Sequence, residues 1–200
     1  MISFLISAIK IIFLLGFLIG IHETGHFLIA KLCKVRVNEF AIGFGPVIWK
    51  KQGKETKYEL RLIPLGGFVN MEGEAEQSEK EGSFTKASIP RRIAIVAAGA
   101  LVNIIFAIIV YFILAMTIRG NLTNAVVGNR VLDADNFGNR LYFASYNTKE
   151  FMLSIVESVK QLFTGKVSSA ELVGPVGISE VVAKTNGFRE FIYILAAISI

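Results

Sequence analysis

The sequence predicts an α-helical integral membrane protein with three or more transmembrane helices and a small membrane-associated β-hairpin or sheet on the cytoplasmic side. Of its 200 residues, 53% are hydrophobic, and the mean hydropathy is +0.57. The hydrophobic residues gather in long runs. Ile11–Ala30 and Ile93–Ile118 can each cross a bilayer core, which takes about 20 helical residues. A third run, Phe191–Ile200, is the last part of the sequence.

The first predicted element is a transmembrane helix within residues 1–33. Lys10 and Lys31 bracket its apolar core, and Met1–Ile9 is expected to be a lead-in turn at the opposite interface. Basic residues predict the orientation of this helix. Residues 31–92 hold 12 Lys and Arg, whereas residues 119–187 hold seven. Cytoplasmic loops are enriched in these residues, so we predict that loop 34–92 is cytoplasmic and that the N-terminus lies outside.

The net charge of +5 is explained by this loop bias, and we expect no nucleic-acid partner. The cytoplasmic loop itself carries strand signals. Apolar and charged residues alternate over Tyr58–Ile63, and Leu65–Gly67 is expected to turn the chain into a second short run, Phe68–Met71. Gly43–Pro46 is expected to break the chain before another run, Val47–Lys51. We predict a small sheet that lies against the membrane.

A second transmembrane helix is predicted over residues 93–118, and an extracytoplasmic segment follows over 119–187. Within that segment, Lys149–Phe163 has the apolar spacing of an amphipathic helix, which lies either along the outer interface or on the other helices. Residues 121–148 are polar and too short for a sizeable domain. Residues 188–200 are predicted to begin a third transmembrane helix, and we expect the sequence to be truncated within it.

The motif HETGH at residues 22–26 predicts the chemistry. Positions i and i+4 share a helix face, so His22 and His26 can ligate one metal at about 2.0–2.1 Å from each ring nitrogen. Glu23 can then act as the general base toward a metal-bound water. These are the only two histidines of the chain. A pair of structural histidines is the alternative, but three ionisable residues inside a bilayer are costly without a function.

The depth of the motif predicts its substrates. His26 lies about 7–8 Å and His22 about 13–14 Å inside the cytoplasmic end of the helix, at 1.5 Å per residue. A site there would cut other membrane helices near their cytoplasmic ends. Such a helix must be held extended, and an exposed strand edge within Tyr58–Met71 could do this by β-augmentation. Gly66 and Gly67 would either admit the substrate backbone or simply close a hairpin, and both interpretations stay open.

Several segments together resemble a known family. HETGH, GFGP at Gly43–Pro46, PLGGFVNMEGE at Pro64–Glu74, AAGALVNIIFA at Ala97–Ala107 and LVGPVGI at Leu172–Ile178 resemble the site-2 protease family of intramembrane zinc metalloproteases. The most similar branch is the bacterial regulator-of-sigma-E type. The resemblance implies a multi-pass protein of the bacterial inner membrane with one Zn²⁺. It also implies an endopeptidase that cleaves membrane-embedded proteins such as anti-sigma factors or signal-peptide remnants, often after a site-1-type protease.

Residue roles follow from the resemblance. His22 and His26 are implied as zinc ligands and Glu23 as general base, with the loop after Pro64 handling substrate through Gly66, Gly67, Phe68, Val69, Asn70 and Met71. Asn103 is the only strongly polar residue within 93–118. It either contacts the metal site or substrate or bonds another helix, and the neighbouring small residues favour helix packing. We retain it as a candidate substrate contact.

Three features depart from the family pattern. Ala100 replaces a proline, and the interval 121–148 is too short for the PDZ domain that this branch usually carries. The family's third zinc ligand, an aspartate in an LDG motif, would lie beyond Ile200. The only aspartates here, Asp133 and Asp135, lie in the predicted outer loop. We therefore expect these 200 residues alone to bind metal weakly and to be inactive.

Two other functions are compatible with parts of the sequence. A catalytically inactive membrane adaptor of the same fold, which binds helices without cutting them, is the main alternative. A metal transporter that passes ions along His22 and His26 would need a continuous polar route, which the second predicted helix does not offer.

Overall fold

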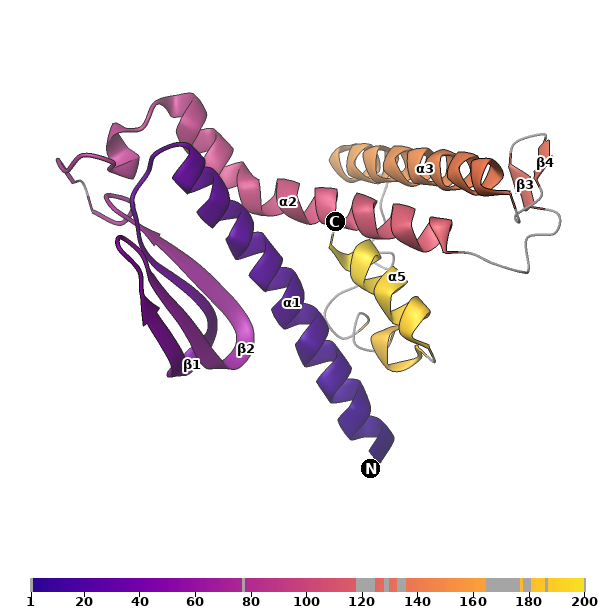
Figure 1. Ribbon diagram of the computed structural model, residues 1–200, viewed down its shortest axis with the longest axis horizontal. Coiled ribbons are helices and arrows are strands. Elements are labelled where there is room, and N and C mark those ends of the chain that lie inside the picture. The colour runs from indigo at the N-terminus through magenta and orange to yellow at the C-terminus, as the bar shows by residue number, and fades with distance from the viewer. Residues whose placement is uncertain are drawn as a thin grey trace. The chain divides into compact units, whose positions relative to one another are not determined.

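The computed structural model describes residues 2–76, 78–117, 125–127, 130–132, 136–164, 177, 181–185 and 187–199. Its elements, in chain order, are α1 (Ile2–Leu32), β1 (Val37–Gln52), β2 (Lys57–Met71), the 3-10 turn η1 (Phe84–Lys86), α2 (Ile89–Met116), β3 (Ala125–Val127), β4 (Arg130–Leu132), α3 (Phe137–Phe163) and α5 (Phe188–Ile198) (Figure 1). The chain divides into two compact units, residues 1–104 and 105–200, which are described separately.

Helix α1 is longer than the predicted apolar core. It is helical from Ile2, so the prediction of a lead-in turn over Met1–Ile9 is wrong. The reason is local, because this stretch contains neither proline nor glycine to interrupt a helix. The helix ends where Lys34 adopts a positive φ of 60° and the Val35 amide donates to the Ala30 carbonyl at 2.9 Å.

Within the described residues, two helices are long and apolar enough to cross a membrane. The span in α1 is Leu5–Leu32 and the span in α2 is Ile89–Met116, with hydropathies of 2.3 and 2.8. Only 17% and 22% of their most apolar windows are buried within the protein. A core helix of a soluble protein would be mostly buried, so this exposure is typical of helices that face lipid.

Strands β1 and β2 form one long antiparallel hairpin whose turn lies at Gly53–Thr56, where the Gly53 amide donates to the Thr56 carbonyl at 2.9 Å. Gly66 and Gly67 therefore do not close this hairpin. Both lie inside β2, where the chain turns between Lys57–Leu60 and Gly67–Asn70. Gly43–Pro46 likewise bends β1 without ending it. Gly43 has a φ of 91° and faces the Ile63 and Arg61 carbonyls, so the two strands bend at the same level.

These bends fold the hairpin back on itself. Glu39–Ile42 pairs with Gly67–Asn70 on one side and with Lys57–Leu60 on the other. Trp49–Gln52 pairs in turn with Lys57–Leu60. Among the described residues, Gly67–Met71 has a pairing partner on one side only. This segment is therefore an edge, which a further strand could join.

A small hydrophobic core fixes the hairpin to both spans. It contains Ala30 of α1, Ile95 of α2 and four strand or loop residues, Val35, Val37, Val69 and Met71. The bent part of the hairpin, which includes Pro64 of β2, extends along α1, and Pro64 contacts Gly16 there (Figure 1). Gly16 lies ten residues from His26, about 15 Å further along the helix. The hairpin thus lies beside α1 as far as Gly16. Several of its apolar side chains are exposed, among them Phe44, Ile48, Trp49, Leu62 and Ile63.

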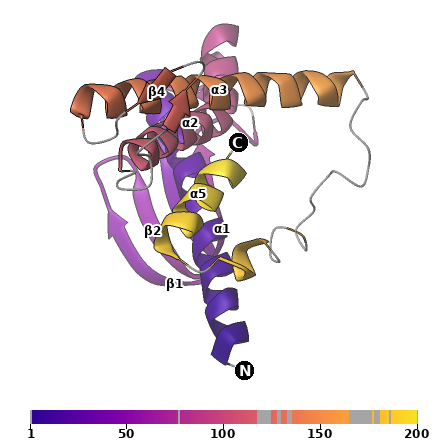
Figure 2. The same ribbon diagram turned by 90° about the vertical axis from the view of Figure 1, so that its right-hand side faces the viewer.

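In the second unit, α3 begins at Phe137 and not at the predicted Lys149. The side chain of Asn136 accepts a hydrogen bond from the Gly138 amide at 2.8 Å and caps the helix start. Polar residues inside the helix bond to their own backbone, as Asn147 does to the Phe143 carbonyl. Phe151 of α3 stacks on Tyr111 of α2, with ring centroids 4.3 Å apart, and both views place α3 alongside this end of α2 (Figure 2). The LVGPVGI segment, apart from Gly177, lies outside the described residues.

Candidate metal centre

The two histidines of the HETGH motif lie one turn apart on α1 and face each other. Their ring centroids are 4.8 Å apart and the rings are inclined at 74°. Both side chains are half-buried. Their closeness follows from the helix, because residues four positions apart stack on one face.

Helix α2 brings Gly99 against both rings. A Cβ atom placed on Gly99 would lie 2.5 Å from the Nε2 atom of His22 and 2.5 Å from the Nε2 atom of His26. The two nitrogens are therefore separated by at most twice that distance, and they converge on one point beside α2. Imidazole nitrogens in such a pair are ligands that Zn²⁺ favours.

His26 is also fixed through its other ring nitrogen. Its Nδ1 lies 2.7 Å from the carbonyl oxygen of Ile95, on α2. A carbonyl oxygen only accepts, so Nδ1 is the donor, and in the neutral form of the ring the lone pair is then on Nε2. Metal-ligating histidines usually donate their second N–H in this way, which sets the tautomer and the ring orientation. The pair therefore fits a zinc ion.

Glu23 faces the hairpin. A Cβ atom on Gly67 would lie 2.9 Å from the Cγ of Glu23 and 2.8 Å from the Ala41 carbonyl oxygen. The carboxylate side chain therefore packs directly on the first residue of the edge segment Gly67–Met71. The predicted general base and a strand edge are adjacent in this geometry.

Comparison with known proteins assigns the chain to a family. The sequence model described as peptidase family M50 matches residues 10–200. The chain belongs to peptidase family M50. The resemblance to the site-2 protease family is confirmed by this match and by relatives that are named as proteases.

Three relatives illustrate the similarity of this M50 chain. A predicted zinc metalloprotease of Clostridium acetobutylicum is 46% identical over 102 residues, 51% of this chain and 30% of the relative. Regulator of sigma-E protease RseP of Escherichia coli is 43% identical over 118 residues, 56% of this chain and 26% of the relative. Protease RseP of Yersinia pestis is 32% identical over 203 residues, 96% of this chain and 44% of the relative. The chain thus spans less than half the length of these relatives.

The residues expected to handle substrate have different surroundings in the M50 chain. The side chains of Val69 and Met71 are buried in the core, so only their backbone groups could meet a substrate. Asn70 is exposed, and the ring of Phe68 lies 5.2 Å below the Arg61 guanidinium. Gly66 has a φ of 115°, and any side chain there would overlap the Phe44 ring.

Asn103 lies on α2 one turn after Gly99 and is half-buried. Its two interpretations, substrate contact and helix packing, stay predictions.

Two contributors to the centre were missed by sequence reasoning, Gly99 and the Ile95 carbonyl. The run of small residues at 97–99 predicted only a close approach of helices. Over the part of the chain that the structure describes, no three His, Cys, Asp or Glu side chains are close enough to hold a metal together. Asp133 and Asp135 fall outside that part.

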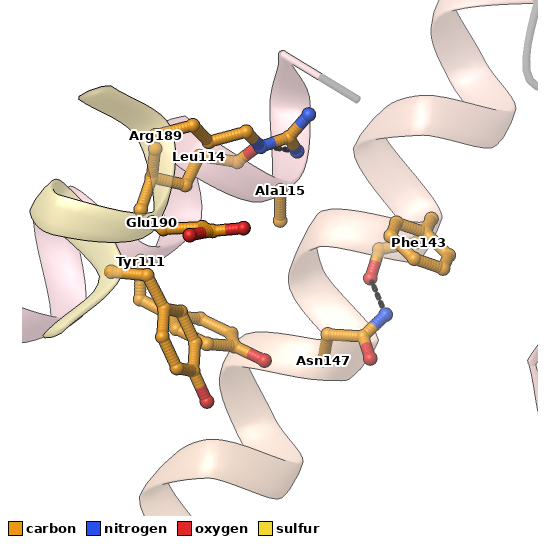
Figure 3. A pocket seen from close by; sticks show the side chains of 8 residues that line it. Tyr111, Leu114, Ala115, Phe143, Asn147, Arg189 and Glu190 are labelled. Carbon is orange, nitrogen blue, oxygen red and sulfur yellow. Dashed lines mark hydrogen bonds between the residues drawn. The ribbon is translucent and has the colours of Figure 1, made fainter. Parts of the chain in front are cut away.

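The second unit has a separate cavity of about 250 Å³ near the end of α2 (Figure 3). Tyr111, Asn147, Glu190 and Tyr193 line it, and Arg189 donates to the Leu114 carbonyl at 3.2 Å. It contains none of the residues predicted for catalysis, so it is not part of the candidate metal centre.

Proposed function

We propose that this M50 chain carries the catalytic centre of an intramembrane zinc metalloendopeptidase. His22 and His26 are ligands of one Zn²⁺, and Glu23 is the general base. The observation that carries this proposal is the convergence of both Nε2 atoms on one point, with Glu23 beside them against the hairpin edge. Membership of a peptidase family supports the reaction class.

Zinc, when bound, acts as a Lewis acid and lowers the pKa of a coordinated water. Glu23 takes a proton from the attacking water and later delivers it to the leaving amide nitrogen, so one carboxylate serves as base and then as acid. His26 keeps its ligating nitrogen available because the Ile95 carbonyl holds the proton on Nδ1. The third ligand proposed is the aspartate of an LDG motif that the resemblance to the site-2 protease family implies.

The substrate is a membrane-embedded protein that adds a strand to the edge Gly67–Met71. Backbone hydrogen bonds from this edge compensate for the hydrogen bonds that a helical substrate loses on unwinding. Side chains of Phe68 and Asn70 contribute contacts, because those of Val69 and Met71 are buried. Since Gly67 lies against Glu23, a peptide held on this edge passes next to the catalytic groups.

We also propose the membrane in which the protein lies and its orientation there. The protein has three or more spans in the bacterial inner membrane, loop 34–92 faces the cytoplasm, and cleavage falls near the cytoplasmic end of the substrate helix. Anti-sigma factors and signal-peptide remnants are the substrate classes proposed. A site-1-type protease acts first in the former case.

The test is Glu23→Gln in the full-length protein, with a transmembrane test substrate. The variant is expected to keep its zinc, because Glu23 is not a ligand, and to lose cleavage by at least about 100-fold, the scale of general-base catalysis. Measured turnover equal to that of the wild type would remove Glu23 from the mechanism. A full-length protein that binds helices but contains no zinc and cleaves nothing would favour the adaptor alternative.

A further inference from the structure

The close contact of Gly99 with both imidazoles assigns this glycine a role. We propose that Gly99 is a positioning residue of the metal centre, whose missing side chain leaves room for the metal between the two Nε2 atoms. This inference rests on the proposed zinc site. It goes beyond that site because Gly99 is neither a ligand nor a catalytic group.

The space at Gly99 is the space a metal needs. A Cβ atom there would lie 2.5 Å from each Nε2 atom and 2.6 Å from the Cδ2 atom of His22. Zinc takes imidazole nitrogens at about 2.0–2.1 Å. A methyl group and a shared metal would therefore compete for one position, or the methyl group would force the two rings apart. Either outcome removes the paired ligation.

A neighbouring glycine shows that helix approach alone does not explain Gly99. Gly25 of α1 lies in the same helix crossing, and a Cβ atom on it would lie 2.8 Å from the Ala98 carbonyl oxygen and 3.0 Å from the Cβ of Val102. Gly25 therefore sets the distance between the backbones of the two helices. Gly99 faces ring nitrogens, so the two glycines perform different tasks.

Helix α2 thus acts on both nitrogens of His26. The carbonyl oxygen of Ile95, one turn before Gly99, accepts a hydrogen bond from Nδ1 at 2.7 Å. Gly99 leaves the space in front of Nε2. The same helix face holds one ring nitrogen in place and leaves the other open, so α2 forms the wall of the site.

The test measures zinc in purified full-length protein, as metal content per chain and as affinity from competition with a chelator. Gly99→Ala is expected to weaken zinc binding by at least about tenfold, the lower limit for losing a supporting contact around a metal. The matched control is Ala100→Val, which enlarges an exposed neighbour on α2. It is expected to keep wild-type zinc content.

Thermal unfolding separates a metal effect from a folding defect. Without metal, Gly99→Ala is expected to unfold at the wild-type temperature or above it, because alanine favours helix over glycine. With zinc, only the wild type and Ala100→Val are expected to gain in unfolding temperature. Wild-type zinc affinity in Gly99→Ala, or an equal loss in Ala100→Val, would overturn the role of Gly99 alone. A zinc-free wild type would overturn the proposed function and this inference with it.

Discussion

His26 and Glu23 could both be recognised from the sequence. Both belong to a motif whose spacing alone predicts a metal and a base on one helix face, and the structure brings His22 and His26 together as expected. Gly99 and the Ile95 carbonyl could not be predicted in this way. A missing side chain and a backbone oxygen leave no chemical signature in a sequence, and their positions depend on how α2 crosses α1.

The contact between Gly67 and Glu23 can be tested by substitution. In Gly67→Ala the added methyl group meets the Glu23 side chain and the Ala41 carbonyl oxygen, so the carboxylate is displaced. We expect full-length Gly67→Ala to retain zinc and to cleave a membrane substrate at least about tenfold more slowly, given how strongly catalysis depends on placement. The matched control is Lys51→Ala, an exposed position of the same hairpin outside the proposed substrate edge. Unchanged kcat in Gly67→Ala would show that this contact does not position Glu23.

At the scale of elements, the sequence predicted the pieces of the hairpin but not how they join. Alternation over Tyr58–Ile63 and the run Phe68–Met71 both became parts of β2. The glycines between them suggested a turn because glycine is common in turns. Which glycine bends a strand and which closes a hairpin depends on the partner strand, whose register no local pattern contains. The start of α3 was missed because residues 121–148 are polar overall. Asn136, a residue type that is favoured at helix starts, caps the helix there.

Glu72, the residue that follows β2, is held by several polar contacts. The effect of its charge on stability can be tested. Glu72 accepts hydrogen bonds from the Ser78 hydroxyl at 2.7 Å and the Asn38 amide at 3.1 Å, and Lys80 lies 3.2 Å away. These contacts, the Ser78 bond first, lower the pKa of Glu72 from 4.5 to about 2. A lowered pKa in the folded state means that this carboxylate stabilises the fold above the unfolded pKa. Its contribution is lost as the pH falls from about 4.5 toward 2.

Thermal unfolding between pH 7 and pH 3 measures this effect. The wild-type unfolding temperature is expected to fall over the acid part of the range. Glu72→Gln should start lower at pH 7 and change less with pH, because the group that titrates has been removed. Parallel curves for the two proteins would contradict the assignment. Glu74→Gln, an exposed neighbour, is the control and should follow the wild type.

At the scale of the whole molecule, two spans and a hairpin that extends along α1 fit a protein embedded in a membrane. Long apolar runs predicted the spans well because length and hydropathy are properties of a continuous segment. The depth of the hairpin was not predicted, since the contact between Gly16 and Pro64 joins residues far apart in sequence.

The topology can be measured with the single cysteine of the chain, Cys33, removed. Lys54→Cys, in the hairpin turn, is expected to react with a membrane-impermeant maleimide only after the inner membrane is opened. Pro64→Cys, beside Gly16, is expected to react poorly under both conditions, because thiol labelling in water needs an ionised, hydrated thiolate. Labelling of Lys54→Cys in intact spheroplasts would place loop 34–92 outside and would contradict the proposed orientation.

The most direct measurement of the central claim is zinc X-ray absorption of the full-length protein, because it reports the ligands and not only the metal content. A site with two imidazole ligands at about 2.0–2.1 Å is expected. His22→Ala and His26→Ala should each remove one imidazole contribution together with most of the bound zinc. Stoichiometric zinc with no imidazole in its shell, or full zinc content in both variants, would contradict the claim.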